Sequence, residues 1–353
     1  MSDISRIDSN FAVSAAPGSV YLSIDEPPFC VYGVNKDEIG YYRLPQSLEA
    51  VNPGFPSLRR HTAGGVIRFR TDSPTLAVKA ETPRETYLMP HMTALGSAGF
   101  DAYSGTHFLA SFVPNIPIVN GLCVEKALYT EACERDADGC LDVTVYMPLY
   151  GAYRDISVKV AEGARILPGK PFGNRKPVVF YGSSITQGGC ASTPGTSYIN
   201  ILSRTLNLYC LNLGFSGSCK GEPETAQYLA SLDMAAFVMD YDHNAPDAAH
   251  LQKTHRAVFE TVRRAHPTLP VIFASSIPVF INRRDMRERR AVIRETYEAA
   301  LAAGDRNVYF LDGTDFFRDV PFDLCTVDGV HPNSLGMYQM AKGFESVLKT
   351  LSL

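Results

Sequence analysis

Residues 177–184 read Pro-Val-Val-Phe-Tyr-Gly-Ser-Ser, and this stretch decides the fold of the second half of the chain. A short apolar run rich in β-branched and aromatic residues is typical of a buried strand. The run leads straight into glycine and serine, which favour a tight turn and a helix N-terminus. Similar apolar runs follow at residues 208–213, 235–239, 270–274 and 307–311. The second half therefore contains the strands of one buried sheet.

The spacing of these runs indicates that strands alternate with helices. Their first residues are 31, 27, 35 and 37 positions apart, about the length of one strand–helix–strand unit. Side chains at helical spacing lie between the third and fourth runs: Leu251, His255, Val258, Phe259 and Val262. Residues 284–302 and 334–348 are expected to form further helices. This order predicts a parallel sheet covered on both faces, with ligands bound outside the carboxyl ends of its strands.

The first half of the chain has the pattern of short β-strands. Residues 66–70 and 76–80 alternate between apolar and polar side chains around the turn-forming residues 71–74, which predicts a hairpin. Residues 141–147 and 155–160 repeat the alternation across a connection that contains glycine. Alternation means that one face of each sheet is exposed to solvent. This half is therefore predicted to be an antiparallel β-sandwich.

A proline- and glycine-rich stretch at residues 167–174 marks the change between the two patterns. A chain of 353 residues is long enough for about two domains. We therefore expect a β-sandwich accessory domain over residues 1–172 and an α/β domain over residues 173–353.

Composition excludes several classes of protein. Lys and Arg total 33 and Asp and Glu total 37, so the formal charge is −4, which argues against a broad basic surface for nucleic acid. No apolar run approaches the length of a membrane span. The eight cysteines contain no Cys-x-x-Cys pair and are expected to be reduced, buried thiols. Residues 1–19 show no basic region followed by an apolar one, so we expect a cytoplasmic protein.

The polar residues that follow the strands suggest nucleophilic catalysis. Ser184 stands at the carboxyl end of the first strand, near a helix N-terminus whose N–H groups favour developing negative charge. The alternatives are a helix cap or a phosphate cradle, although no Gly-Lys-Ser/Thr follows as a P-loop requires. His331 follows the fifth strand, and Asp328 three residues earlier is placed to orient its ring. Asp328 in a plain capped turn is the alternative interpretation.

Two further strand ends supply candidate hydrogen-bond donors. The loop after the second strand contains Gly217, where a glycine lets bare backbone approach a substrate oxygen. The loop after the third strand contains Asn244, whose side-chain amide is a second donor. Backbone N–H groups together with an asparagine amide form the kind of oxyanion hole that acyl transfer needs.

In this order, Gly182-Ser183-Ser184-Ile185-Thr186, Gly217, Asn244 and Asp328-x-x-His331 resemble the four blocks of the SGNH (GDSL-like) hydrolase superfamily over residues 176–348. The resemblance implies a flavodoxin-like α/β/α fold with Ser184 as nucleophile, His331 as base and Asp328 orienting it. It also implies an oxyanion hole made by the Ser184 N–H, the Gly217 N–H and the Asn244 side chain, and chemistry that needs no metal or organic cofactor.

Two positions depart from the family pattern. Ser183 replaces the usual aspartate before the nucleophile, and residues 242–245 read Asp-His-Asn-Ala in place of Gly-x-Asn-Asp. The chain is more similar to a two-domain subset that carries Gly-Ser-Ser-Ile-Thr and an N-terminal β-sandwich, and that includes carbohydrate acetylesterases and acyltransferases.

The expected function is a serine esterase that hydrolyses small acyl esters, with acetyl groups on carbohydrates preferred. An acyltransferase with the same triad and a catalytically degenerate glycan-binding protein are the alternatives. The expected partner is a small-molecule or carbohydrate ester, with no nucleic acid and no membrane. The oligomeric state stays open.

Other residues carry competing interpretations. Asp240, Asp242, His243 and Asn244 resemble a metal site, which would make Ser184 incidental. Cys190 is a rival nucleophile, although a buried structural cysteine is favoured because no histidine is near it in sequence. Some aromatic residues of the first half would bind sugar rings if exposed, but a place in the sandwich core is favoured: Phe100, Tyr103, Phe108 and Phe112. The basic run at residues 283–290 is interpreted as a solvated helix face.

Overall fold

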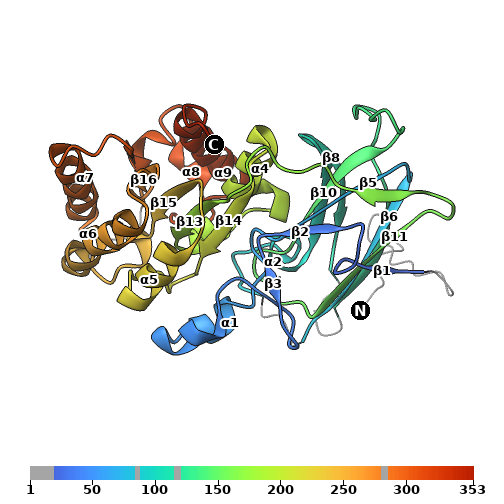
Figure 1. The fold of residues 1–353 in the computed structure, drawn as a ribbon, viewed down its shortest axis with the longest axis horizontal. Coiled ribbons are helices and arrows are strands. Elements are labelled where there is room, and N and C mark those ends of the chain that lie inside the picture. Colours follow the sequence, from blue (N-terminus) through green and yellow to red (C-terminus); the bar gives the residue numbers. More distant parts are fainter. Residues whose placement is uncertain (1–19, 84–87, 115–120, 280–284) are drawn as a thin grey trace. The chain divides into compact units, whose positions relative to one another are not determined.

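The computed structural model describes residues 20–83, 88–114, 121–279 and 285–353 (Figure 1). The chain forms two compact units. The first contains residues up to 43 together with residues 60–171 and 192–195, and the second contains residues 44–59, 172–191 and 196–353. Most of the chain therefore divides near residue 171, but a short early segment belongs to the later unit. The expected domains, residues 1–172 and 173–353, stay a proposal.

The first unit is built on two antiparallel sheets. One has the order β1-β11-β6-β9 and the other the order β12-β5-β10-β7-β8, with β2 paired to β5. The strands of the first sheet are β1 (Leu22–Ser23), β6 (Thr75–Glu81), β9 (Leu122–Ala127) and β11 (Asp155–Val160). Those of the second are β2 (Cys30–Tyr32), β5 (Val66–Thr71), β7 (Phe100–Ser104), β8 (His107–Phe112), β10 (Leu141–Tyr146) and β12 (Ile166–Pro168). A small ribbon, β3 (Asn35–Lys36) with β4 (Tyr41–Tyr42), and the short helix α2 (Ala94–Ala98) complete the unit.

The core of the first unit lies between the two sheets and confirms the antiparallel sandwich. Ile67 and Phe69 of β5 belong to the same buried cluster as Val78 of β6 and Val158 of β11, which lie in the other sheet. Alternate residues of each strand enter the cluster because side chains point to opposite faces of a strand in turn.

The hairpin expected from residues 66–70 and 76–80 is wrong. β5 pairs with β2, β10 and β12, whereas β6 pairs with β9 and β11, so the turn between them crosses from one sheet to the other. β10 and β11, which repeat the pattern, also lie in different sheets. Alternation in sequence shows that a strand has a buried face, but both sheets of a sandwich supply such a face, so the pattern does not identify the partner strand.

Three of the four candidate sugar-binding aromatics belong to the core, as favoured from the sequence. Phe100 and Phe112 are fully buried and Tyr103 is 6% exposed. Phe108 is 42% exposed and stacks on Tyr129, with ring centroids 6.2 Å apart. The density of aromatic residues in this half therefore mainly reflects packing between the sheets.

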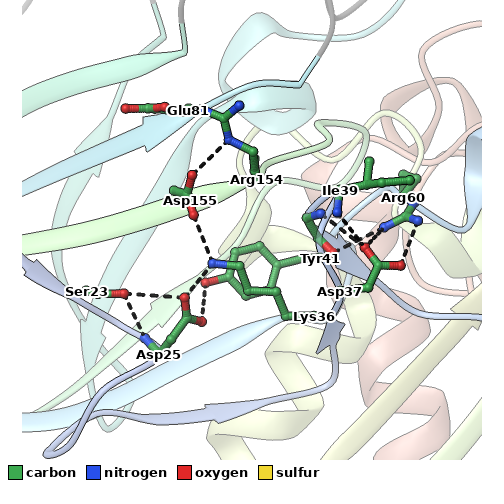
Figure 2. Close-up of polar contacts among 11 residues, drawn as sticks. Ser23, Asp25, Lys36, Asp37, Ile39, Tyr41, Arg60, Glu81, Arg154 and Asp155 are labelled. Atoms are coloured by element: carbon green, nitrogen blue, oxygen red, sulfur yellow. Dashed lines mark hydrogen bonds and ion pairs between the residues drawn. The ribbon is translucent and has the colours of Figure 1, made fainter.

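Charged side chains tie the β3–β4 ribbon to the edge of the first sheet (Figure 2). Lys36 binds the carboxylates of Asp25 and Asp155, at 2.5 and 3.0 Å. The Tyr41 hydroxyl donates to Asp25 at 2.7 Å, and Arg154 binds Asp155 at 2.9 Å. Single exposed ion pairs add little to stability. A network of contacts that share the same two carboxylates fixes the position of the ribbon more firmly than one pair would.

The second unit contains the expected parallel sheet. Its order is β14-β13-β15-β16-β17, and every neighbouring pair is parallel. The strands are β13 (Val178–Gly182), β14 (Cys210–Gly214), β15 (Ala236–Asp240), β16 (Val271–Ala274) and β17 (Val308–Leu311). The five predicted runs are thus confirmed as strands, with starts that differ by one or two residues.

Helices cover both faces of this sheet. On β13, Val179 and Tyr181 face the core shared with α5, α6 and α7, whereas Phe180 contacts Tyr198 of α4 and Phe344 of α9. The helices are α1 (Phe55–Leu58), α3 (Ser184–Gln187), α4 (Tyr198–Leu206), α5 (Pro223–Ser231), α6 (Ala248–Ala265), α7 (Met286–Ala302), α8 (Phe322–Cys325) and α9 (Ser334–Leu348). Three 3₁₀ helices also belong here: η3 (Gln46–Val51), η5 (Asp242–Asn244) and η6 (Gly313–Asp315). In the residues with described positions, none of the helices has the length and apolar character needed to cross a membrane.

The stripe predicted for α6 is buried throughout, as expected for a helix that packs on the sheet. The histidine in this stripe, His255, is a core residue whose Nδ1 pairs with Thr296 Oγ1 of α7 at 2.9 Å. Burial lowers the pKa of His255 to about 3, so this ring stays neutral.

Candidate active site

Ser184 is the first residue of α3, and only Ser183 separates it from the end of β13. The Ser183 hydroxyl accepts a hydrogen bond from the Ile185 N–H at 3.1 Å and caps this helix. Gly182 must be glycine because a Cβ there would overlap Thr186 Oγ1 and the Asp240 carbonyl oxygen. Ser183 thus supplies the cap, and Ser184 is left in the first helical turn at the carboxyl end of the central strands.

Ser184, His331 and Asp328 form a continuous hydrogen-bonded relay. Ser184 Oγ lies 2.9 Å from His331 Nε2, and His331 Nδ1 lies 2.8 Å from Asp328 Oδ2. A carboxylate accepts hydrogen bonds, so Nδ1 carries the proton and Nε2 is free to accept from the serine hydroxyl. The structure therefore brings together the three side chains selected from the sequence as nucleophile, base and orienting group.

The Asp328–His331 turn is locally determined. Asp328 Oδ1 accepts from the His331 and Val330 N–H groups at 2.7 and 3.0 Å, so one oxygen closes the turn and the other faces the ring. Thr326 and Pro332 form a β-bridge at the base of the loop. Burial acts to raise the pKa of Asp328, but the hydrogen bonds from His331 and Val330 outweigh it and lower that pKa. The carboxylate is charged, as an orienting group requires.

Gly217 is the exposed tip of the loop after β14. Its φ of +68° is in the left-handed region that favours glycine, and its flanking neighbours Phe215 and Ser218 are buried. Within the described ranges, the Gly217 N–H has no hydrogen-bond partner. Gln187 of α3 accepts from the Ser216 N–H at 3.0 Å, which links this loop to the helix of Ser184.

Asn244 ends the short helix η5 after β15. Its Oδ1 accepts from the Cys219 N–H at 3.3 Å, so the side chain is anchored to the Gly217 loop. The amide nitrogen keeps its two hydrogens without a partner among the residues whose placement is described. Gly182 is in register with Gly214 on one side and with Asp240 on the other, so the loops with Ser184, Gly217 and Asn244 leave the same edge of the sheet.

Sequence reasoning did not identify the buried hydrogen bonds under the α3 turn, and it considered Asp240 only as part of a metal site. Asp240, at the end of β15, accepts from Thr186 Oγ1 and from the Tyr198 hydroxyl, each at 3.0 Å. Burial, with a smaller contribution from the nearby Asp242 carboxylate, raises the pKa of Asp240 to about 7. Thr186 stands in the quoted Gly-Ser-Ser-Ile-Thr block, but its role depends on a contact 54 residues away, which the block alone does not indicate.

The basic run of residues 283–290 is not a purely solvated face. Arg289 is 2% exposed and donates to the backbone carbonyls of Asp242 and Ala245, at 2.5 and 2.9 Å, and to Asp285 Oδ2 at 2.9 Å. It therefore holds the loop of Asn244 from the side of α7. Arg283 and Arg284 lie outside the described residues. The sequence offered no signal for Arg289, because nearby acids suit a surface helix equally well.

The metal-site interpretation gains no support from geometry. In the described part of the chain, Asp240, Asp242 and His243 do not bring their ligand atoms together as a bound metal requires. Asp240 instead binds Thr186 and Tyr198, and Asp242 Oδ2 accepts from the Ser276 N–H at 2.9 Å.

Cys190 is buried, as favoured from the sequence, and is poorly suited to act as a nucleophile. It is 5% exposed, and burial, with the Asp328 carboxylate adding to the effect, raises the pKa of its thiol to about 12. The reactive form of cysteine is the thiolate, which is scarce near neutral pH at such a pKa.

Comparison with known proteins agrees with this fold. Residues 175–349 match the GDSL-like lipase/acylhydrolase family, and residues 21–166 match the N-terminal region of SGNH hydrolase-type esterases. No curated protein matches the chain significantly in sequence.

Solved structures resemble the chain over nearly its whole length. A "putative GDSL-like lipase" from Bacteroides ovatus is 27% identical with a TM-score of 0.80, covering 94% of this chain and 97% of the other. The salicylyl-acyltransferase SsfX3 of a tetracycline biosynthetic pathway is 18% identical, with a TM-score of 0.76 and coverage of 95% and 98%. An acetyl xylan esterase from Butyrivibrio proteoclasticus is 12% identical, with a TM-score of 0.61 and coverage of 94% and 98%.

An antiparallel sandwich followed by a parallel-sheet domain, together with the two family matches, defines an SGNH hydrolase. Residues 175–349 of the chain belong to the GDSL-like lipase/acylhydrolase family.

Proposed function

We propose that the chain is a serine esterase that hydrolyses small acyl esters through an acyl-enzyme. The observation that carries the proposal is the relay from Ser184 Oγ to His331 Nε2 at 2.9 Å and from His331 Nδ1 to Asp328 Oδ2 at 2.8 Å. Family membership supports the same chemistry, since it places the chain among acylhydrolases.

In the first half of the proposed reaction, Ser184 Oγ attacks the ester carbonyl carbon while its proton passes to His331 Nε2. The bond from carbonyl carbon to oxygen becomes single, and the negative oxygen receives hydrogen bonds from the oxyanion hole. Asp328 keeps the ring oriented and stabilises the imidazolium. The tetrahedral intermediate collapses, the alcohol leaves with the proton from His331, and an acyl group stays on Ser184. Water then attacks by the same steps and releases the acid.

The proposed oxyanion hole consists of the Ser184 N–H, the Gly217 N–H and the Asn244 amide. The lack of a partner on the last two donors in the described structure supports this role, because a donor aimed at a transition state must be available to it. Losing one such donor typically lowers kcat by about 10²–10³-fold.

The proposed substrate is an acetyl or similarly small acyl ester of a carbohydrate. Structural similarity to an acetyl xylan esterase, and to a family two carbohydrate esterase from Clostridium thermocellum in complex with cellohexaose, supports this choice. Transfer of the acyl group to another alcohol uses the same residues. Structural similarity to a salicylyl-acyltransferase supports this alternative. Product analysis with competing alcohol acceptors separates the two outcomes.

We also propose a cytoplasmic location. The eight cysteines are in the reduced state in the structure, which agrees with a reducing compartment.

The test of the esterase proposal is hydrolysis of p-nitrophenyl acetate and of a panel of acetylated sugars by Ser184→Ala. We expect kcat to fall by about 10⁴-fold or more, because the nucleophile is removed. Cys210→Ser is the control and should keep most of the activity, since Cys210 is a buried cysteine at the amino end of β14, the end opposite the candidate site. Wild-type rates in Ser184→Ala would refute the proposal. A wild-type protein that binds acetylated glycans but releases no acid would favour the glycan-binding alternative.

A further inference from the structure

An early segment of the chain belongs to the second compact unit. Residues 44–59 lie in that unit, although the residues before and after them belong to the first. The segment forms η3 and α1, coloured blue in Figure 1, and η3 packs against α5. Its apolar side chains Leu44, Leu48, Phe55 and Leu58 belong to the buried core that also contains the strands of the parallel sheet. The segment is therefore fixed in the same unit as the candidate active site.

Asn52 joins η3 to α1 and is 4% exposed. Its amide nitrogen donates to the Ser218 carbonyl oxygen at 3.1 Å and to Glu222 Oε1 at 2.6 Å, and its Oδ1 accepts from the Gly54 N–H at 3.0 Å. Two acceptors face the nitrogen and one donor faces the oxygen, so the partners fix the orientation of the amide. A buried side chain satisfied in this way is a rigid link between residues 52 and 218.

The residues on both sides of Gly217 are held by this segment. Ser218 is bound by Asn52, and the ring of Phe215 packs on that of Phe55 with centroids 5.2 Å apart. Gly54 approaches so closely that a Cβ there would overlap Ser218 Oγ. Gly217 itself is exposed and lacks side-chain packing, because a Cβ built on it meets no atom within 4 Å. Its conformation depends on how its neighbours are anchored.

We propose that Asn52 is a positioning residue for the reaction: it holds the Gly217 loop so that the Gly217 N–H faces the oxyanion. The inference rests on the proposed esterase function. Asn52 acts through Ser218 and not on the substrate. Small displacements of a group that acts in the transition state can lower a rate by as much as about 10²-fold, so removal of this link should affect turnover more than substrate binding.

The test uses the full chain with Asn52→Asp. This change keeps an oxygen for the Gly54 N–H but removes the donor to Ser218. The matched control is Asn174→Asp, because Asn174 is also buried and its amide nitrogen donates to the Lys176 and Tyr209 carbonyls near the amino ends of β13 and β14. On p-nitrophenyl acetate, Asn52→Asp should lower kcat and kcat/KM together by about 10–100-fold. Asn174→Asp should change them by less than about threefold under conditions where both variants are folded.

A double variant separates positioning from general stability. Asn52→Asp with Glu222→Gln restores the link between residues 52 and 222, since the new amide donates to the new carboxylate, but the Ser218 carbonyl still lacks its donor. We expect the melting temperature to recover toward the wild-type value while kcat stays low. Recovery of kcat together with the melting temperature would show a merely structural role and would overturn the proposal.

Hydrogen exchange provides a readout that does not depend on activity. The Ser218 N–H is bonded to the Phe215 carbonyl at 2.9 Å, and the Cys219 N–H to Asn244 Oδ1. Both amides should exchange faster in Asn52→Asp but not in Asn174→Asp. Unchanged exchange in Asn52→Asp would overturn the proposal. If instead Ser184→Ala keeps the wild-type rate, the esterase function fails, while exchange at residues 218 and 219 still decides whether Asn52 holds the loop.

Discussion

At the scale of single residues, Asp328 performs two tasks with one side chain. One carboxylate oxygen closes the turn through the N–H groups of Val330 and His331, and the other binds the ring of His331. The residue that shapes the loop therefore also sets the tautomer of His331. A separation of three residues is enough for the Asp328 carboxylate to reach the His331 ring, because the turn folds the aspartate back on the histidine.

Replacing Asp328 with asparagine tests this double task. The amide still accepts hydrogen bonds from the turn, but it no longer provides a charge that favours a proton on Nδ1. We expect kcat to fall by about 10²–10⁴-fold with little change in KM. The His331 ring is still held in place, but the tautomer with the proton on Nδ1 is no longer favoured. Steady-state kinetics with p-nitrophenyl acetate measures this effect. A kcat within threefold of the wild type would show that Asp328 does not orient the base.

Asp240 should make the stability of the protein depend on pH. Its pKa is raised from an ordinary value near 3.8 to about 7 in the folded chain, so the folded state holds a proton that the unfolded state has lost. The stability associated with Asp240 is therefore fully present at low pH. It is lost as pH rises from about 4 through 7.

Asp240→Asn removes this dependence. We expect the variant to gain stability relative to the wild type between pH 5 and pH 8, by an amount on the order of 1–4 kcal/mol. Urea unfolding at the two pH values measures the change. A stability difference that is the same at both would contradict the assignment of a raised pKa to this buried carboxyl.

At the scale of elements, the loops after β14 and β15 are held by polar side chains from distant parts of the second unit. Asn52 binds the loop of Gly217, and Arg289 on α7 binds the carbonyls of Asp242 and Ala245 on either side of Asn244. The two loops are joined to each other by the bond between Cys219 and Asn244. The two loops are thereby fixed while the Gly217 N–H and the Asn244 amide nitrogen keep their hydrogens without a partner in the described structure.

Arg289→Lys should lower kcat because Arg289 binds the two carbonyls through Nη1 and Asp285 through Nε, and a lysine has a single nitrogen that cannot occupy both positions. We expect a loss of about tenfold with KM nearly unchanged. Arg263→Lys is a matched control, since Nη1 of Arg263 likewise donates to two carbonyls, those of His266 and Leu269, in a loop that precedes β16, and its Nη2 donates to the Asn307 carbonyl before β17. Equal losses of kcat in the two variants would show that Arg289 has no particular link to the site.

The elements differ in how far the sequence predicts them. The strands of the parallel sheet are continuous apolar runs, and the chain order of strand and helix determines their direction, so both could be predicted. The approach of Ser184, His331 and Asp328 could be predicted because parallel strands bring their carboxyl ends to one edge. The pairing of β5 and β6 could not, because alternation is the same in either sheet of a sandwich. Asn52, Thr186 and Arg289 could not either, since each acts through contacts with residues far away in sequence.

At the scale of the whole molecule, the boundary between the compact units does not coincide with a single point in the sequence. The match to the N-terminal region of SGNH hydrolase-type esterases spans residues 21–166, but residues 44–59 within that span belong to the second unit. The early part of the chain therefore contributes directly to the unit that contains Ser184. A description of residues 173–353 alone leaves out part of the support for the candidate active site.

The most direct test of the central claim is to locate the nucleophile by mass spectrometry. The full-length protein is allowed to react with a fluorophosphonate, digested, and its peptides sequenced. A single adduct on Ser184, formed in the wild type and lost in His331→Ala, is the predicted result. An adduct on any other residue, or no adduct on a protein that hydrolyses p-nitrophenyl acetate, would contradict the account.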